Sequence, residues 1–306
     1  MTSRTWQMNF PKGLVRGKLK AGEALSAHTS FRIGGPAAFW VEPKDVKELK
    51  KVVLFARKNK VPVFVMGGGT NVLASDNGFN GIIIHLGAKA FKKLKVAGRT
   101  VTVGSGYPTA GLVRSCCGLG LSGMESLIGI PGTVGGAVYM NAGGWSSPLF
   151  KNIGDYVVSL KVMDRGGTVK TLKRRDIDFG YRSSGLSSNI IIEAVLRFGT
   201  EESSVLTSRC SKFLKMKKEK QVLDAPSAGC VFKNPQGSQF TTGQMIDTLG
   251  LKGRRIGGAE ISHRHANFIV NKGGATCHDV MKLIGLVSRQ VMDSYNIPLE
   301  LEIKVI

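Results

Sequence analysis

Apolar and polar positions along the first part of the chain alternate between helical and strand-like spacing. Between residues 45 and 58 apolar residues recur at the three-to-four residue spacing of an amphipathic helix: Val46, Leu49, Val52, Val53 and Ala56. The apolar run 61–66 that follows predicts a short buried strand, which leads directly into Gly67. The pattern therefore predicts a mixed α and β fold.

The same patterns recur up to residue 199. Strands are predicted at 82–86, 100–104, 156–163, 169–172 and 190–198, and a helix at 108–117.

Beyond residue 199 the pattern changes, which predicts a further domain. The expected elements are a long basic helix at 201–221, helices at 241–249 and 275–295, a strand at 267–270 and a terminal alternating strand at 299–306.

Composition limits the class of protein. At 306 residues with 42% hydrophobic residues, the chain has enough apolar material for two or three compact units. We find no apolar run long enough to cross a bilayer, and the charged start MTSRTWQMNFPKGLVRGKLK lacks the apolar segment of a secretion signal. We therefore expect a cytoplasmic protein.

The cysteines and histidines predict neither a disulfide framework nor a metal site. The five cysteines are odd in number and show no CxxC spacing, and the five histidines lack a metal-ligand spacing. The adjacent pair Cys116 and Cys117 falls on a predicted helix, where packing is the expected role.

A net charge of +22 attracts nucleic acids, anionic membranes or phosphorylated small molecules. Charge alone does not choose among them. The lysines of KFLKMKKEK (212–220) have no interleaved aromatic residues, which favours a solvated basic helix beside an anionic ligand over a nucleic-acid surface.

Three glycines follow the strand in VPVFVMGGGTN (61–71). Successive N–H groups without a Cβ can surround phosphate oxygens, so Gly67, Gly68 and Gly69 are a candidate phosphate cradle. The motif is neither GxGxxG nor a Walker loop, and a plain tight turn is the alternative.

A second, apolar glycine cluster occupies residues 120–144. Glycine at this density suits backbone packed against a flat ligand, and it argues against a membrane helix. Two glycine loops in one α/β region favour a dinucleotide with a pyrophosphate and a planar ring.

Three isolated residues are candidates for chemistry, each with a simpler alternative. Arg182 lies among small and aromatic residues, where it could bind a carboxylate or be a surface arginine. Glu302 alternates with Leu301 and Ile303, so its side chain projects from the opposite face of the predicted strand, and the alternative is a simple solvated glutamate. Cys230 stands beside Gly229 in the turn PSAGCVFKNP, instead of in a periodic apolar run.

Taken in order, a set of motifs resembles the UDP-N-acetylenolpyruvoylglucosamine reductase family: HTSFRIGG (28–35), PVFVMGGGTNVLASDNGFNG (62–81), SLIGIPGTVGGAVYMNAG (126–143), YRSS (181–184), PSAGCVFKNP (226–235), DTLGLKGRRIGGAEIS (247–262), HANFIVN (265–271) and LELEIKV (299–305). The resemblance covers nearly all of the chain from His28 onward. The chain resembles the shorter branch of the family, which lacks an inserted loop over the substrate.

The resemblance implies an α+β fold. An FAD-binding domain of the vanillyl-alcohol-oxidase type, with two α/β subdomains, would be followed by a C-terminal α+β substrate-binding domain. The expected ranges are 1–86 joined by strand 299–306, then 87–199, and 200–298 for the substrate domain.

The resemblance also implies cofactors and a reaction. NADPH would reduce FAD, and the flavin hydride would then reach C3 of the enolpyruvyl group of UDP-N-acetylglucosamine enolpyruvate. The product would be UDP-N-acetylmuramate, a precursor of peptidoglycan and so of the cell wall. Negative charge builds at C2 and on the carboxylate, so the enzyme must stabilise an enolate and deliver one proton.

By motif position, Arg182 matches the family's arginine at the carboxylate, Glu302 its carboxylate near the enolate and Cys230 its proton donor. Residues expected to bind FAD are Gly67, Gly68, Gly69, Thr70, Asn71, Ile130, Pro131, Gly132, Gly135, Gly136 and Ala137. Residues expected to bind substrate are Lys220, Lys233, Asn234 and Asn267.

Many members of the family have serine in place of Cys230. An unperturbed thiol with a pKa of about 8.5 is mostly protonated at neutral pH, so it can serve as an acid, whereas a thiolate cannot. We expect a monomer with no membrane or specific nucleic-acid partner. The alternatives are another flavin oxidoreductase of this fold, or a basic nucleic-acid-binding protein with a vestigial flavin site.

Overall fold

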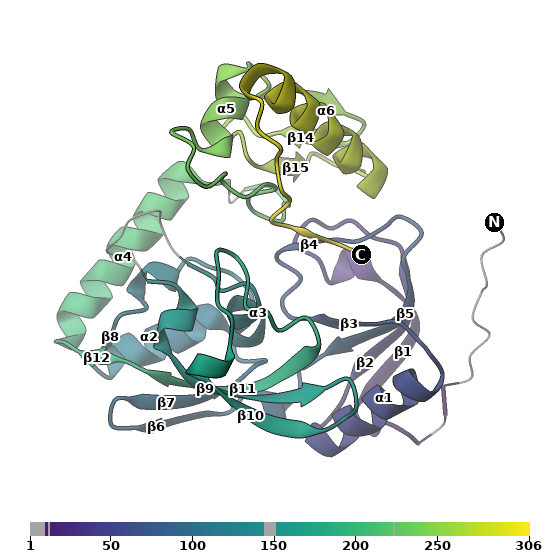
Figure 1. Cartoon of the computed structure of the whole chain (residues 1–306), viewed down its shortest axis with the longest axis vertical. Helices are drawn as coiled ribbons and strands as arrows, with labels where there is room; N and C mark the ends of the chain where they lie inside the picture. Colours follow the sequence, from purple (N-terminus) through teal and green to yellow (C-terminus); the bar gives the residue numbers. More distant parts are fainter. Residues whose placement is uncertain (1–9, 12, 144–150, 223) are drawn as a thin grey trace. The chain divides into compact units, whose positions relative to one another are not determined.

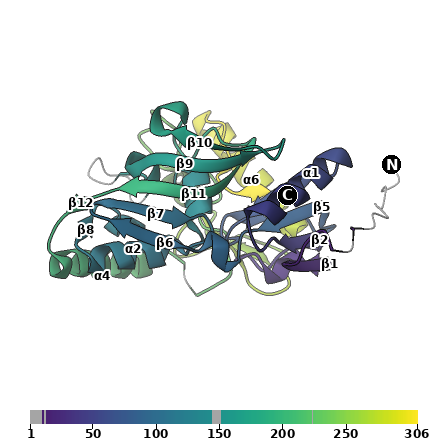
Figure 2. The same ribbon diagram turned by 90° about the horizontal axis from the view of Figure 1, so that it is seen from below.

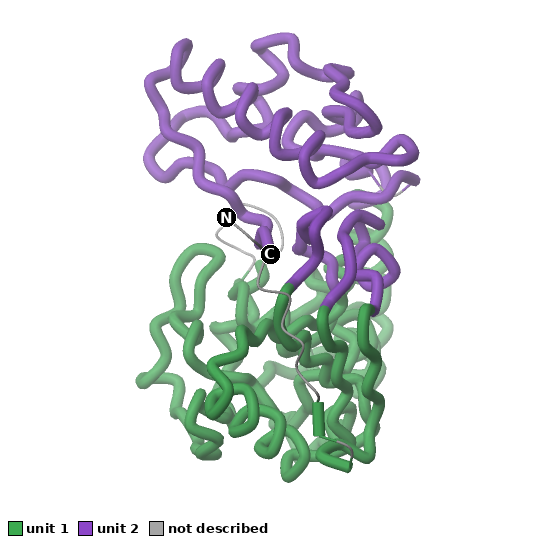
Figure 3. Tube along the Cα trace, turned by 90° about the vertical axis from the view of Figure 1, so that its right-hand side faces the viewer, with its two compact units in different colours: residues 1–22, 38–68, 80–216 green, residues 23–37, 69–79, 217–306 purple. Residues whose placement is uncertain are grey.

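A computed structural model describes residues 10–11, 13–143, 151–222 and 224–306 of the chain (Figure 1). Half of the chain's charged start (1–9 and 12 of residues 1–20), and the last two residues of the glycine-rich NAGGW, lie outside the described residues. The chain divides into two compact units, coloured in Figure 3. Unit 1 contains residues 1–22, 38–68 and 80–216, and unit 2 contains residues 23–37, 69–79 and 217–306.

The first sheet belongs mostly to unit 1 and has the strand order β1-β2-β5-β3. Its strands are β1 (Lys18–Ala24), β2 (Pro36–Glu42), β5 (Phe79–His85) and β3 (Val63–Met66). β3 and β5 pair in parallel, with Val63 opposite Ile82. Helix α1 (Val46–Lys58) shares an apolar core with this sheet.

Helix α1 forms where the periodicity predicts it. Asp45 accepts a hydrogen bond from the Glu48 N–H at 2.9 Å and so caps the first turn. Of the five apolar residues at helical spacing, Leu49, Val52, Val53 and Ala56 are buried in the core beside the sheet, and Val46 is partly buried against it.

The second sheet lies entirely in unit 1 and is antiparallel throughout, in the order β10-β9-β11-β7-β6 (Figure 2). Its strands are β6 (Leu94–Ala97), β7 (Thr100–Gly104), β9 (Val157–Asp164), β10 (Val169–Lys173) and β11 (Asn189–Arg197). Helices α2 (Thr109–Gly118) and α3 (Val134–Tyr139) share one apolar core with this sheet. Two short strands, β8 (Leu121–Ser122) and β12 (Gly199–Thr200), pair separately and are the remaining strands of the unit among the described residues.

Cys116 and Cys117 are buried in that core, in agreement with a packing role. Burial, with a smaller contribution from Glu125, raises the pKa of the Cys116 thiol to about 12. Such a thiol is inert at neutral pH.

Unit 2 has its own core, formed around a long helix and a small sheet. The elements are β4 (Val72–Leu73), α5 (Thr242–Thr248), β13 (Arg255–Ile256), β14 (Ala259–Ile261), β15 (Ile269–Asn271), α6 (Cys277–Tyr295) and β16 (Lys304–Val305). Helix α4 (Ser203–Lys220) begins in unit 1, and its last four residues belong to unit 2. Within the described part of the chain, no helix is both long and apolar enough to cross a membrane.

The terminal strand differs from the prediction of a continuous strand at 299–306. Regular pairing is limited to β16, which runs parallel to β4, with Leu301 forming an isolated bridge to Phe232. The main chain before β16 bonds instead to the loop after Cys230, since Lys233 N–H donates to Glu300 O and Glu302 N–H to Val231 O, both at 2.8 Å. Alternation of side chains alone could not distinguish this loop pairing from a sheet strand.

Candidate active site

The first glycine loop begins where β3 ends, at Met66. The N–H groups of Gly67, Gly68 and Gly69 donate no hydrogen bond to any described residue. Three successive unused donors are the feature that a phosphate cradle needs. Gly69 has a φ of +63°, and a Cβ there would collide with the backbone oxygen of His28.

The second glycine loop leads into α3. Thr133 caps the helix by accepting a hydrogen bond from the Gly136 N–H, and Gly135 N–H donates to Ser105 O at 2.8 Å. A Cβ on Gly135 would stand 2.8 Å from the Ser105 Cβ, so only glycine allows this approach. Ile130, Pro131 and Gly132 precede this helix, and Gly135, Gly136 and Ala137 lie inside it.

The structure brings the two glycine loops together within unit 1. A Cβ on Gly67 would lie only 2.6 Å from the Thr133 Oγ1. Beside this point the buried Ser105 Oγ has no hydrogen-bond partner among the described residues. A narrow, Cβ-free cradle with unused donors fits the pyrophosphate of FAD.

Thr70 and Asn71 continue the first loop in unit 2. Asn71 Nδ2 donates to Glu302 O at 3.0 Å, and Asn71 O accepts from the Lys304 N–H at 2.9 Å. The Asn71 side chain therefore holds the terminal segment, and a direct contact with FAD stays a prediction.

Arg182 is held beside the end of the second glycine loop, also in unit 1. Its backbone has a φ of +54°, inside a tight turn in which Gly180 and Ser183 bond to each other. Asn141 Nδ2 donates to Gly180 O at 2.9 Å, and Ser184 Oγ donates to Tyr139 O at 2.8 Å. These bonds connect the turn to the last residue of α3 and to the segment that follows it.

The Arg182 guanidinium has a defined position. It lies 5.2 Å from the Tyr181 ring centre, and its Nη1 is 3.2 Å from the point where a Cβ on Gly143 would stand. A non-glycine residue in the left-handed region is uncommon and marks a backbone constrained by its surroundings. These features support the functional interpretation of Arg182 over that of a free surface arginine.

The turn that carries Cys230 lies in unit 2 and bends at Gly229, whose φ is +80°. Cys230 is half-buried and bridges to Phe268, whereas the other four cysteines of the chain are buried. It is thus the cysteine best placed to meet a ligand or solvent.

Glu302 and Asn267 lie on either side of this turn. Val231, next to Cys230, accepts a hydrogen bond from the Glu302 N–H at 2.8 Å and donates to Asn267 O at 2.9 Å. Asn267 also clamps Phe232, with Oδ1 accepting from the Phe232 N–H at 3.0 Å and Nδ2 donating to Phe232 O at 2.8 Å. Cys230 and Glu302 therefore come from neighbouring backbone segments of one unit.

The remaining predicted substrate residues have structural partners in the same unit. Lys233 Nζ pairs with Glu300, and Asn234 Oδ1 accepts from the Thr242 N–H at 3.0 Å. Lys220 is exposed in the last turn of α4. Their contacts with substrate stay predictions.

Sequence reasoning missed Lys217, one helical turn before Lys220. Burial lowers the pKa of the Lys217 ammonium, and its Coulombic interaction with Cys230 acts in the opposite direction. Within the basic run only burial distinguishes this lysine, which is why its spacing alone could not reveal it. Among the described residues, no group of His, Cys, Asp and Glu side chains could hold a metal ion.

Two family models match the chain. Residues 37–173 match an FAD binding domain, and residues 221–306 match the C-terminal domain of UDP-N-acetylenolpyruvoylglucosamine reductase. The two matches and the fold thus define an FAD-containing oxidoreductase, and the expected α+β fold, with an FAD-binding domain and a C-terminal α+β domain, is confirmed.

The relatives agree along nearly the whole chain. The UDP-N-acetylenolpyruvoylglucosamine reductase of Anoxybacillus flavithermus is 40% identical, over 95% of this chain and 95% of that protein. The enzyme of the same name from Bacillus velezensis is 37% identical, over 95% and 94%. The crystal structure of that reductase from Thermus caldophilus superposes with a TM-score of 0.78 at 34% identity, over 95% and 98% of the two chains. This chain belongs to the UDP-N-acetylenolpyruvoylglucosamine reductase family.

Proposed function

We propose that this chain reduces UDP-N-acetylglucosamine enolpyruvate to UDP-N-acetylmuramate with FAD as cofactor and NADPH as electron source. The observation that carries the proposal is the pairing of the Cys230 turn with the Glu302 segment through Val231. This pairing brings a proton donor and a carboxylate from distant parts of the sequence to adjacent backbone positions, in a chain of this family.

The reaction needs three things from the side chains. Bound FAD supplies the hydride that is added to C3 of the enolpyruvyl group. The chain must hold the substrate carboxylate, balance the charge that develops at C2, and deliver a proton to C2.

In this proposal Arg182 binds the carboxylate of the substrate. A guanidinium forms two parallel hydrogen bonds with a carboxylate, and the constrained turn of Arg182 fixes the direction from which it does so. Its delocalised positive charge also stabilises the enolate form of the substrate, because that form spreads negative charge onto the carboxylate.

Cys230 delivers the proton, and Glu302 places its carboxyl group near the enolate. A protonated thiol transfers its proton to C2 and leaves a thiolate, which recovers a proton from solvent before the next turnover. The half-buried position of Cys230 suits both steps, because the sulfur can reach substrate and water.

The remaining assignments belong to the same proposal. Gly67, Gly68 and Gly69 hold the FAD pyrophosphate, and the segment from Ile130 to Ala137 lines the flavin. Lys220, Lys233, Asn234 and Asn267 hold the anionic substrate. The enzyme is a cytoplasmic monomer.

Substrate-dependent NADPH oxidation by FAD-loaded wild type, Cys230→Ala and Cys230→Ser tests this proposal. We expect Cys230→Ala to lose about 10²- to 10⁴-fold in kcat, the usual range for a general acid, while Cys230→Ser retains much of the rate because a hydroxyl can also donate. Full turnover by Cys230→Ala would remove the proton-donor assignment.

Stopped-flow mixing tests the activity separately. Flavin reduced by NADPH is expected to be reoxidised by the enolpyruvyl substrate. If oxygen alone reoxidised it rapidly and the substrate had no effect, the chain would be an oxidase and the proposed activity would be wrong.

A further inference from the structure

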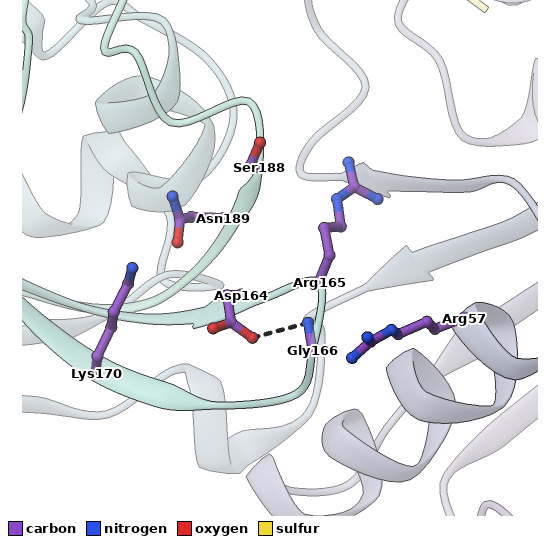
Figure 4. A pocket seen from close by; sticks show the side chains of 7 residues that line it. All are labelled: Arg57, Asp164, Arg165, Gly166, Lys170, Ser188 and Asn189. Atoms are coloured by element: carbon purple, nitrogen blue, oxygen red, sulfur yellow. Dashed lines mark hydrogen bonds between the residues drawn. The ribbon is translucent and has the colours of Figure 1, made fainter.

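Unit 1 contains a pocket that the proposed reaction does not use. Its volume is about 490 Å³, within the usual range for small-molecule sites of about 300–1,000 Å³. It is lined by Arg57, Asp164, Arg165, Gly166, Lys170, Ser188 and Asn189 (Figure 4). These residues come from the end of α1, the end of β9 and the turn after it, β10, and the start of β11 with the residue before it. None belongs to a glycine loop or to the Cys230 turn.

The pocket is strongly basic. Arg57, Arg165 and Lys170 face a single carboxylate, and none of the three cations forms an ion pair in the described part of the chain. Asp164 Oδ1 is already used by the turn, since it accepts from the Gly166 N–H at 2.8 Å and the Thr168 N–H at 2.9 Å. The Asp164 carboxylate balances one of the three positive charges, so these four side chains leave the pocket with a net positive charge.

Arg165 belongs to the turn between β9 and β10 and Arg57 extends to it, and Arg165 forms a hydrogen bond with the main chain. Arg165 Nη2 donates to Ser187 O at 3.2 Å, which leaves further guanidinium N–H groups for a ligand. Arg57 Nη1 lies 3.2 Å from the point where a Cβ on Gly166 would stand, so the guanidinium reaches the turn because residue 166 has no side chain. Figure 4 shows Arg57 and Lys170 on opposite sides of the Asp164 carboxylate.

Asn189 adds an unsatisfied polar group. Its Oδ1 is buried and accepts no hydrogen bond from the described residues. Asn189 also lines the pocket, so its side-chain amide stands beside the space that a ligand would fill. The pocket thus combines an excess of positive charge with a polar amide side chain.

We propose that this pocket is a binding site for a phosphorylated small molecule that also carries hydroxyl groups, such as a sugar phosphate. Arg57, Arg165 and Lys170 bind the phosphate, for which a guanidinium is well suited, and Asn189 takes a hydroxyl. The site is separate from the proposed reaction and does not depend on it.

Calorimetric titration of the FAD-loaded protein with glucose 6-phosphate, and separately with inorganic phosphate, tests the proposal. We expect glucose 6-phosphate to bind wild type, and the double variant Arg57→Gln/Arg165→Gln to bind it at least about tenfold more weakly, since one lost charge-assisted bond already amounts to about that factor. The matched control Lys51→Gln removes an exposed charge from the same helix outside the pocket and is expected to bind as wild type does.

Asn189→Ala distinguishes the contribution of the ligand's hydroxyl groups to binding from that of its phosphate. We expect it to weaken binding of glucose 6-phosphate and to leave binding of inorganic phosphate unchanged. Wild type that gives no binding heat with glucose 6-phosphate at about 100-fold excess, or a double variant that binds as tightly as wild type, would overturn the proposal. A loss in Lys51→Gln equal to that in the double variant would overturn it too, because binding would then follow net charge alone.

Discussion

At the residue scale, the most informative interaction is the Coulombic one between the Lys217 ammonium and the Cys230 sulfur. Their electrostatic interaction favours the thiolate, whereas a proton donor must be protonated. Sequence reasoning identified Cys230 and left its protonation open. The structure identifies Lys217 as a residue that influences it.

Lys217→Met is expected to move the pH dependence of Cys230 upward. Without the nearby positive charge the thiolate is less stable, so alkylation by iodoacetamide should begin at higher pH, and activity that needs the protonated thiol should persist to higher pH. Lys218→Met, an exposed neighbour on the same helix, is the control. An unchanged alkylation profile in Lys217→Met would exclude this influence.

Gly69 offers a second test at this scale. Gly69→Ala places a Cβ both in the left-handed region and against the His28 carbonyl, so we expect a loss of about 2–4 kcal/mol in the free energy of unfolding, together with loss of bound flavin. Gly22 has nearly the same φ, +64°, with nothing within 4 Å, so Gly22→Ala should lose only about 1 kcal/mol. Urea unfolding measures both, and equal losses would contradict the steric argument.

At the scale of elements, a buried carboxylate organises the start of α1. Glu48 accepts hydrogen bonds from the N–H groups of Arg16, Gly17 and Lys44 at 2.9–3.1 Å. Burial acts to raise the pKa of Glu48, but these donors outweigh it and hold the pKa below the ordinary value of 4.5. The ionised form therefore connects the segment before β1 to the helix.

Glu48→Gln is expected to lower the free energy of unfolding by about 2–3 kcal/mol at pH 7, since the amide has one acceptor oxygen where the carboxylate has two. Because the folded pKa lies below the unfolded one, the contribution of Glu48 is complete above about pH 4.5 and is lost as pH falls through the folded pKa. Urea unfolding of wild type and variant between pH 7 and pH 3 should show their difference shrinking with acid. The exposed control Glu219→Gln should show little effect at either pH.

The elements themselves were largely predictable. Helices α1, α2, α5 and α6 and strand β7 match their predicted ranges within two residues, because an amphipathic period over a long segment is a strong local signal. The helix α3 inside the second glycine cluster was not predicted, since glycine is a poor helix former. Its stability comes from the Thr133 cap and from packing on the second sheet.

At the scale of the whole molecule, the net charge is +22. Three of the cations that contribute to it line the pocket in unit 1. The boundary between the two units passes through the first glycine loop, between Gly68 and Gly69. The finer division into ranges 1–86, 87–199 and 200–298 stays a prediction.

The sequence by itself determined the periodic helices and strands, the two glycine loops and the motifs that place the chain in its family, because each of these features depends on residues that are close together in the sequence. Only the tertiary structure decided that Gly67 meets Thr133, that the Glu302 segment pairs with the Cys230 turn, and that cations of α1 and β10 share a pocket. Contacts between distant segments of this kind depend on chain topology and on which side chains are buried. No local spacing encodes them, since the residues involved are far apart in the sequence.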